Sequence, residues 1–277
     1  MKQNILPILG KYKWKIVIIY LYIIAGQILF LLEPYFLGRA IDGLLVGEYT
    51  FLFLLFSAHI GENLFMYKRM VFDIRVYSRI YNDLVMNYLD RDKSEDTSAK
   101  IARTEMLHVV IDFIEHHLHF YIASLITIIG SLYFVFLQSG MTGLIMVFCI
   151  LPIALIVKLF YKKIAQSMHI GNSHYEQKFD IMETQDRPLI NSFFERRRRI
   201  IIAQNTIHAK HWFSLNGTKT LFLIAALAIF TNQSEGITHG TVISIFTYIN
   251  QMLISLMSLP VFIEVFTRIK DVIKRIE

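Results

Sequence analysis

A polar stripe just before an apolar stretch near residue 120 carries residue types that bind metals. The segment ARTEMLHVVIDFIEHHLHFY covers residues 102–121. At about 100° per residue, six of its acidic and histidine side chains fall within roughly a 100° arc of a helix. They are Glu105, His108, Asp112, Glu115, His116 and His119.

Imidazole and carboxylate groups spaced three and four residues apart on a helix suit zinc or another divalent transition metal. The candidate metal ligands are His108, Asp112, His116 and His119. The alternative is a polar face that a long helix presents to water or to a cavity between helices. His117 points away from the stripe and therefore serves as an internal control.

A second polar stripe interrupts the apolar stretch of residues 51–67. At helical spacing, His59, Glu62, Asn63, Met66, Met70 and Asp73 fall within an arc of roughly 100°. Ionisable groups at membrane depth are costly and usually face a cavity or each other. The candidate cavity-lining residues are His59, Glu62, Asn63, Met66 and Asn250. A sharper hypothesis is proton- or metal-coupled binding, and a simpler one is hydrogen bonding between helices, with Asn250 or Gln251 as partner.

The elements that position these stripes are transmembrane helices. Of the 277 residues, 55% are hydrophobic and 14% aromatic, which is too apolar for an ordinary soluble domain. A helix needs about 20 mostly apolar residues to cross a bilayer. Six segments qualify: residues 16–37, 51–67, 118–137, 141–161, 212–230 and 241–263. The sequence therefore predicts an all-α, multi-pass integral membrane protein with one six-helix domain over residues 1–277, and a kink at Pro152 in the fourth helix.

The basic residues predict the orientation of these helices. With the N-terminus inside, all 28 lysines and arginines except Arg39 fall in the two termini and the two inner connections. The positive-inside rule therefore places both termini in the cytoplasm, and we expect a bacterial inner membrane. The inner connections, of about 50 residues each, show helical periodicity and predict long cytoplasmic extensions. The net charge of +6 needs no nucleic acid to explain it.

Three segments carry a resemblance to a known family. They are EPYFLGRAIDGLL (33–45), VFDIRVYSRIYNDLVMNYLD (71–90) and THGTVISIFTYINQMLISLMSLPV (238–261). In this order and spacing they resemble the exporter-type transmembrane domain of ABC transporters. The resemblance implies a homo- or heterodimer with twelve helices around a cavity, in which helices four and five cross to the partner subunit. It also implies separate ATPase subunits that dock on the inner loops.

The phosphate-binding pattern G-x-x-x-x-G-K-[ST] of an ATPase does not occur in the sequence. Only Gly10 and Lys11 approach it, and Tyr12 follows them. The chain stops at Glu277, where the family's nucleotide-binding domain would begin. We therefore expect no enzymatic activity and no cofactor in this chain, with ATP used by a subunit supplied in trans, unless the chain is one domain of a longer protein. A divalent metal is the cofactor that the polar stripes allow.

The family's coupling helices would fall at about residues 91–100 and 184–195, by position in the inner loops. The candidate docking residues are Phe193, Phe194, Asp96 and Arg187. The aromatic pair is predicted to be exposed and to fill a pocket on the ATPase. The alternative is that both segments are solvated turns. The alternative function is an ATPase-independent membrane protein on the same scaffold, which binds or carries a metal or small molecule.

Overall fold

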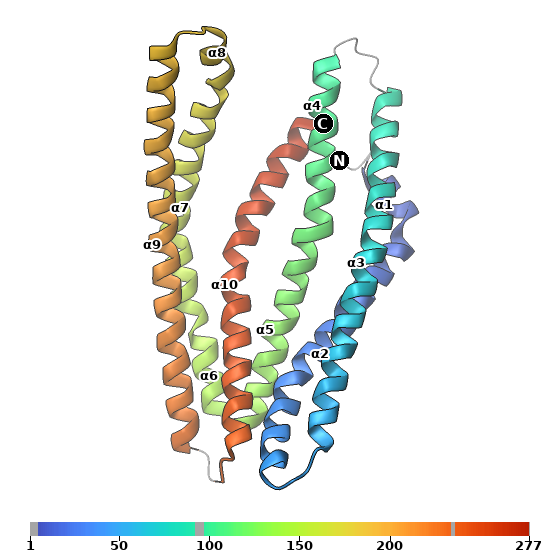
Figure 1. Cartoon of the computed structure of the whole chain (residues 1–277), viewed down its shortest axis with the longest axis vertical. Coiled ribbons are helices and arrows are strands. Elements are labelled where there is room, and N and C mark those ends of the chain that lie inside the picture. Colours follow the sequence, from blue (N-terminus) through green and yellow to red (C-terminus); the bar gives the residue numbers. More distant parts are fainter. Residues whose placement is uncertain (1–4, 92–96, 234–235, 277) are drawn as a thin grey trace. The chain divides into compact units, whose positions relative to one another are not determined.

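The computed structural model describes residues 5–91, 97–233 and 236–276. These residues form helices and no strand, which confirms the predicted all-α class (Figure 1). The elements are α1 (Ile5–Lys11), α2 (Lys13–Leu45), α3 (Thr50–Arg91), α4 (Thr97–Asp112), the π-helical turn η1 (Phe113–His117), α5 (Leu118–Gln138), α6 (Gly140–Phe148), α7 (Ile150–Glu176), α8 (Lys178–Glu183), α9 (Arg187–Gln233) and α10 (His239–Ile276).

Five helical stretches among the described residues are long and apolar enough to cross a membrane. They are Lys13–Leu45, Thr104–Gln138, Gly140–Gly171, Arg187–Asn232 and His239–Leu259. These stretches contain the first, third, fourth and fifth predicted spans in full. They also contain the sixth span, residues 241–263, except for its last few residues. Helix α3 is not among them, because polar side chains interrupt its apolar segment and lower its hydropathy. A membrane crossing by residues 51–67 stays a prediction.

The α2–α3 hairpin is made by a glycine-based helix end. Gly47 has a φ of 79°, which only glycine adopts without strain. This conformation lets the Glu48 N–H donate to the Gly43 carbonyl at 2.8 Å and the Gly47 N–H donate to the Leu44 carbonyl at 3.3 Å. The pair of bonds is a Schellman motif, which satisfies carbonyls that the helix end leaves free. Helix α3 then starts at Thr50 and runs back along α2 (Figure 1).

The chain divides into two compact units. The first comprises Met1–Gly143 and Ile229–Glu277, and the second comprises Leu144–Ala228. In the first unit, α2 packs against α3, α5 and α10, and α10 also packs against α5. The Gln27 amide donates to the Thr127 hydroxyl at 2.6 Å, and the buried Tyr248 hydroxyl donates to the Leu31 carbonyl at 2.8 Å. Each bond joins helices far apart in sequence and so specifies which faces meet.

The C-terminal end of α2 and the N-terminal end of α10 meet at two glycines. An added Cβ on Gly38 would lie 2.5 Å from the Gly240 carbonyl oxygen, so the backbones are in direct contact there. Asp42 of α2 caps α10, because its Oδ1 accepts the Gly240 N–H at 2.9 Å and its Oδ2 accepts the Thr238 hydroxyl at 2.6 Å. Thr238 itself accepts the Thr241 N–H at 3.2 Å, as an N-cap residue does.

The opposite end of the first unit, near the beginning of α2, has a hydrophobic core of its own. Its fully buried members come from α2, α3 and α4, and they include Ile19, Tyr77, Ile80, Leu107 and Val110. The α3 residues repeat at three- and four-residue spacing, so one face of the helix is buried beyond the apolar segment 51–67. The predicted helical extension is therefore present, and tertiary packing against α4 stabilises it.

The second unit is a hairpin of α7 and α9, with the short helix α8 between them (Figure 1). The Gln204 amide donates to the Ser167 carbonyl at 2.8 Å, and the Arg197 guanidinium donates to the Gly171 carbonyl at 3.0 Å. Helices α6 and α7 are separated by Cys149 alone, three residues before Pro152, which has no N–H to donate to the preceding turn.

Candidate functional site

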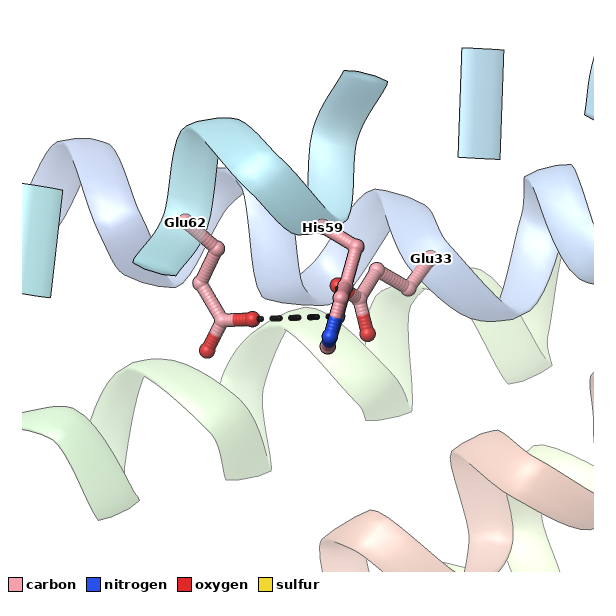
Figure 2. Close-up of side chains that lie close together, drawn as sticks. All are labelled: Glu33, His59 and Glu62. Atoms are coloured by element: carbon pink, nitrogen blue, oxygen red, sulfur yellow. Dashed lines mark hydrogen bonds and ion pairs between the residues drawn. The ribbon is translucent and has the colours of Figure 1, made fainter. Parts of the chain in front are cut away.

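Three ionisable side chains meet where α2 and α3 run side by side. Glu33 comes from α2, and His59 and Glu62 come from neighbouring turns of α3 (Figure 2). The distance from His59 Nδ1 is 2.9 Å to Glu33 Oε1 and 3.8 Å to Glu62 Oε2. One ligand atom from each residue lies within 4.8 Å of the other two. Among the described residues, this is the group of three histidine, cysteine or acidic side chains that meets the spacing of a metal site.

The group is partly buried on its carboxylate side and open on its imidazole side. The Glu33 and Glu62 side chains are 20% and 24% exposed, whereas the His59 side chain is 62% exposed. A carboxylate accepts hydrogen bonds, so the His59 Nδ1–H donates to an ionised Glu33. The same nitrogen has a lone pair for a metal when its proton is lost. The arrangement can hold either a proton or a cation between its oxygens and the ring.

Only some of the predicted cavity-lining residues belong to this group. His59 and Glu62 belong to it, but Asn63 donates to the His59 carbonyl at 2.8 Å within its own helix. Met66 is exposed, and Asn250 is partly buried on α10. The interhelical partner of His59 is Glu33 of α2 and not an amide of α10. Cavity lining by these five residues stays a prediction.

Glu33 is the site residue that the sequence analysis missed. It is the one charged side chain in the apolar segment 16–37. Charged groups in such segments usually pair with another polar group. That rule predicts a partner for Glu33, but it does not say which of the other helices provides it.

The histidine-rich stripe before α5 does not gather into a metal group among the described residues. His108 and His116 are exposed, whereas His119 is buried. The expectation of one shared face assumed an uninterrupted α-helix, but residues Phe113–His117 form a π-helical turn. Metal binding by His108, Asp112, His116 and His119 stays a prediction.

His119 instead joins a buried polar cluster with α3. Its Nε2 lies 3.3 Å from the Tyr77 hydroxyl, and its Nδ1 lies 3.8 Å from Asp73 Oδ2. Arg69 Nε lies 3.5 Å from the same carboxylate oxygen. Arg69, Asp73 and Tyr77 are spaced four residues apart, so α3 presents them on one face. Asp73 had appeared at the end of the second stripe, and its observed neighbours are Arg69 and His119.

The comparison with known families decides the class of the protein. A family model described as the ABC transporter transmembrane region matches residues 5–240. The chain belongs to this family. No curated protein matches this ABC transmembrane region closely enough to serve as a relative. Membership makes the chain an integral membrane component of an ABC-type transporter, and the family works in a membrane with ATPase subunits.

The predicted docking residues of this ABC transmembrane region differ in exposure. The turn between α8 and α9 is short, and Gln185 adopts a φ of 54° within it. Arg187 begins α9 and is exposed. Phe193 and Phe194 lie further along α9 rather than in a turn. Asp96 lies outside the described residues.

The prediction of two exposed aromatic rings is wrong for Phe193. Its ring is 6% exposed and stacks on His174 of α7 at 4.2 Å between ring centroids. The buried His174 Nε2 also donates to the Phe193 carbonyl at 3.2 Å. Phe194 is 45% exposed, because the next residue of a helix points about 100° away. Phe193 therefore closes the hairpin, and Phe194 is the ring that faces outward.

Proposed function

We propose that this chain is the membrane-spanning subunit of an exporter-type ABC transporter, with ATPase subunits supplied as separate polypeptides. The match to the ABC transmembrane region over residues 5–240 is the main support. The sequence contains no phosphate-binding pattern of the ATPase kind. In this proposal the chain catalyses no reaction itself and uses ATP only through its partner.

The proposed transporter is a dimer in which the α7–α9 hairpin reaches the partner subunit. Support comes from the internal contacts of this hairpin, which forms a compact unit by itself. Gln204, Arg197 and Phe193 each bond or stack across it. A hairpin that is stabilised by its own contacts does not require the rest of its chain to keep its shape. The termini of the subunit lie in the cytoplasm in this proposal, as the distribution of lysine and arginine predicts.

In this proposal the ATPase subunit docks at the beginning of α9, where Arg187 and Phe194 are both exposed. Aromatic residues and arginine are enriched at protein interfaces, and a few such residues carry most of the binding energy. The buried Phe193 ring holds this part of α9 against α7, because it stacks on His174.

The test replaces Phe194 with Ala in the full chain and measures ATP hydrolysis that co-purifies with it from its native membranes. Phe194→Ala should lower the recovered ATPase by at least about tenfold, since interface aromatics contribute 2 kcal/mol or more. Phe213→Ala is the matched control, because Phe213 lies on the same helix and is 81% exposed within a predicted span. It should leave the recovered activity unchanged.

Phe193→Ala separates docking from folding. This variant removes a buried ring, so it should lower the thermal stability of the chain as well as ATPase recovery. Phe194→Ala should lower recovery alone. Equal recovery with Phe194→Ala and Phe213→Ala would refute the docking assignment. Wild-type protein that recovers no ATPase from its native membranes would contradict the proposed function.

A further inference from the structure

We propose that Glu33, His59 and Glu62 form a binding site for a divalent transition-metal ion that joins α2 to α3. The site is separate from the docking surface, and the inference does not depend on the proposed ATPase partner. Three features carry it: the donor set, the spacing of the donor atoms and the charge balance.

The donor set is one imidazole nitrogen and two carboxylate oxygens. Imidazole favours zinc and its neighbours in the first transition series, whereas sites for magnesium and calcium use oxygen ligands. Three protein ligands with one position left open are characteristic of zinc sites at which a further molecule binds. The mixture of His59 with Glu33 and Glu62 therefore favours Zn²⁺ over Mg²⁺.

The spacing is close to that of ligands around one ion. Ligand atoms at about 2.0–2.1 Å from a tetrahedral zinc ion lie about 3.4 Å from each other. In the structure, Glu33 Oε1 is 2.9 Å and Glu62 Oε2 is 3.8 Å from His59 Nδ1. One distance is shorter than required and the other is longer. Each distance differs from the required value by about 0.5 Å or less, which is within the range of a small side-chain rotation.

The net charge of the three side chains also favours a bound cation. Among the described residues, His59 is the ion-pair partner of both carboxylates. When both carboxylates are ionised, even a protonated His59 leaves one net negative charge in a segment that we predict to lie in the membrane. A charge at that depth costs several kcal/mol unless it is paired. A divalent ion bound by a neutral imidazole and two carboxylates gives a group with no net charge.

The open side of the group leaves room for a fourth ligand. The His59 side chain is 62% exposed, and the two carboxylates lie behind it. Water or a ligand atom from a transported molecule can complete the coordination shell from this side. The ion would stabilise the contact between α2 and α3, because its ligands come from both helices (Figure 2).

The experiment measures Zn²⁺ bound to the purified, tag-free full chain in detergent, by equilibrium dialysis and elemental analysis. Wild-type protein should bind about one Zn²⁺ per chain, and excess Mg²⁺ should not displace it. Glu33→Gln, His59→Gln and Glu62→Gln should each weaken Zn²⁺ binding by at least about tenfold. Glu48→Gln is the matched control, because Glu48 is exposed between α2 and α3 and lies outside the group.

A second readout separates binding from folding. Zn²⁺ should raise the thermal midpoint of the wild type and of Glu48→Gln, because a ligand that binds the folded state stabilises it. The rise should be absent in the three site variants, whose midpoints without metal show that they fold.

The double variant His108→Ala and His116→Ala tests the other histidine stripe. Unchanged Zn²⁺ binding in this variant supports the site at Glu33. Three results would overturn the proposal: no Zn²⁺ above background in the wild type, site variants that bind like the wild type, or loss of the ion from the His108 and His116 variant.

Discussion

An alanine at Gly38 should loosen the glycine contact between α2 and α10. The new Cβ would lie 2.5 Å from the Gly240 carbonyl oxygen and 3.0 Å from Ser244 Cβ. Packed atoms need about 3.5 Å, so the two helices must separate by roughly 1 Å. That movement also lengthens the 2.9 Å bond from the Gly240 N–H to Asp42, which caps α10.

The magnitude follows from three contributions. Overpacking of a close contact costs about 1–3 kcal/mol, and a weakened hydrogen bond to a carboxylate adds about 1 kcal/mol. Alanine gains about 0.5–1 kcal/mol over glycine inside a helix. The net loss is about 2 kcal/mol of unfolding free energy, which corresponds to a fall of about 5 °C in the thermal midpoint.

Thermal melts of purified protein followed by circular dichroism at 222 nm measure this change. Gly217→Ala is the matched control, because Gly217 lies inside α9 and no atom is within 4 Å of its added Cβ. That variant receives the helix-forming benefit of alanine without a clash, so its midpoint should stay level or rise. Equal midpoints for Gly38→Ala and Gly217→Ala would show that the two backbones are not in direct contact.

Two further substitutions test polar contacts of α3 in the first unit. Tyr77→Phe removes the buried hydroxyl that lies 3.3 Å from His119 Nε2 and should cost about 1–3 kcal/mol in melts, whereas Tyr67→Phe, at a 65% exposed position, should cost little. Asp83 accepts hydrogen bonds from the Lys11 ammonium at 2.8 Å and the Tyr12 hydroxyl at 2.9 Å, which hold the pKa of its carboxyl below the ordinary value. A carboxyl whose pKa is lower in the folded state stabilises the fold at pH values above its ordinary pKa of about 3.9. This stabilisation is lost as the pH falls through the lowered pKa. Asp83→Asn should therefore lower the melting midpoint slightly at neutral pH and match the wild type in acid, and a difference that does not change with pH would contradict this pairing.

The sequence by itself determined the class of the protein, because hydropathy and charge are local properties. Five of the predicted spans coincide with helices that are apolar enough to cross a membrane. The motif with Gly38 and Asp42 also pointed to the right family. The weakest span, residues 51–67, shows the limit of this approach. Its polar residues are what lower its hydropathy, and two of them, His59 and Glu62, belong to the candidate ion site.

Only the tertiary structure decided which polar groups meet. The pairing of Glu33 with His59 depends on how α2 and α3 align, which the Gly47 turn and interhelical packing set. The π-helical turn at Phe113–His117 cannot be read from a uniform 100° period, and the contacts of His119 with Tyr77 and Asp73 depend on how α5 packs against α3. Phe193 and Phe194 are identical in chemistry and adjacent in sequence. One is buried against His174 and the other is exposed, because a helix turns by about 100° per residue and only one of them faces α7.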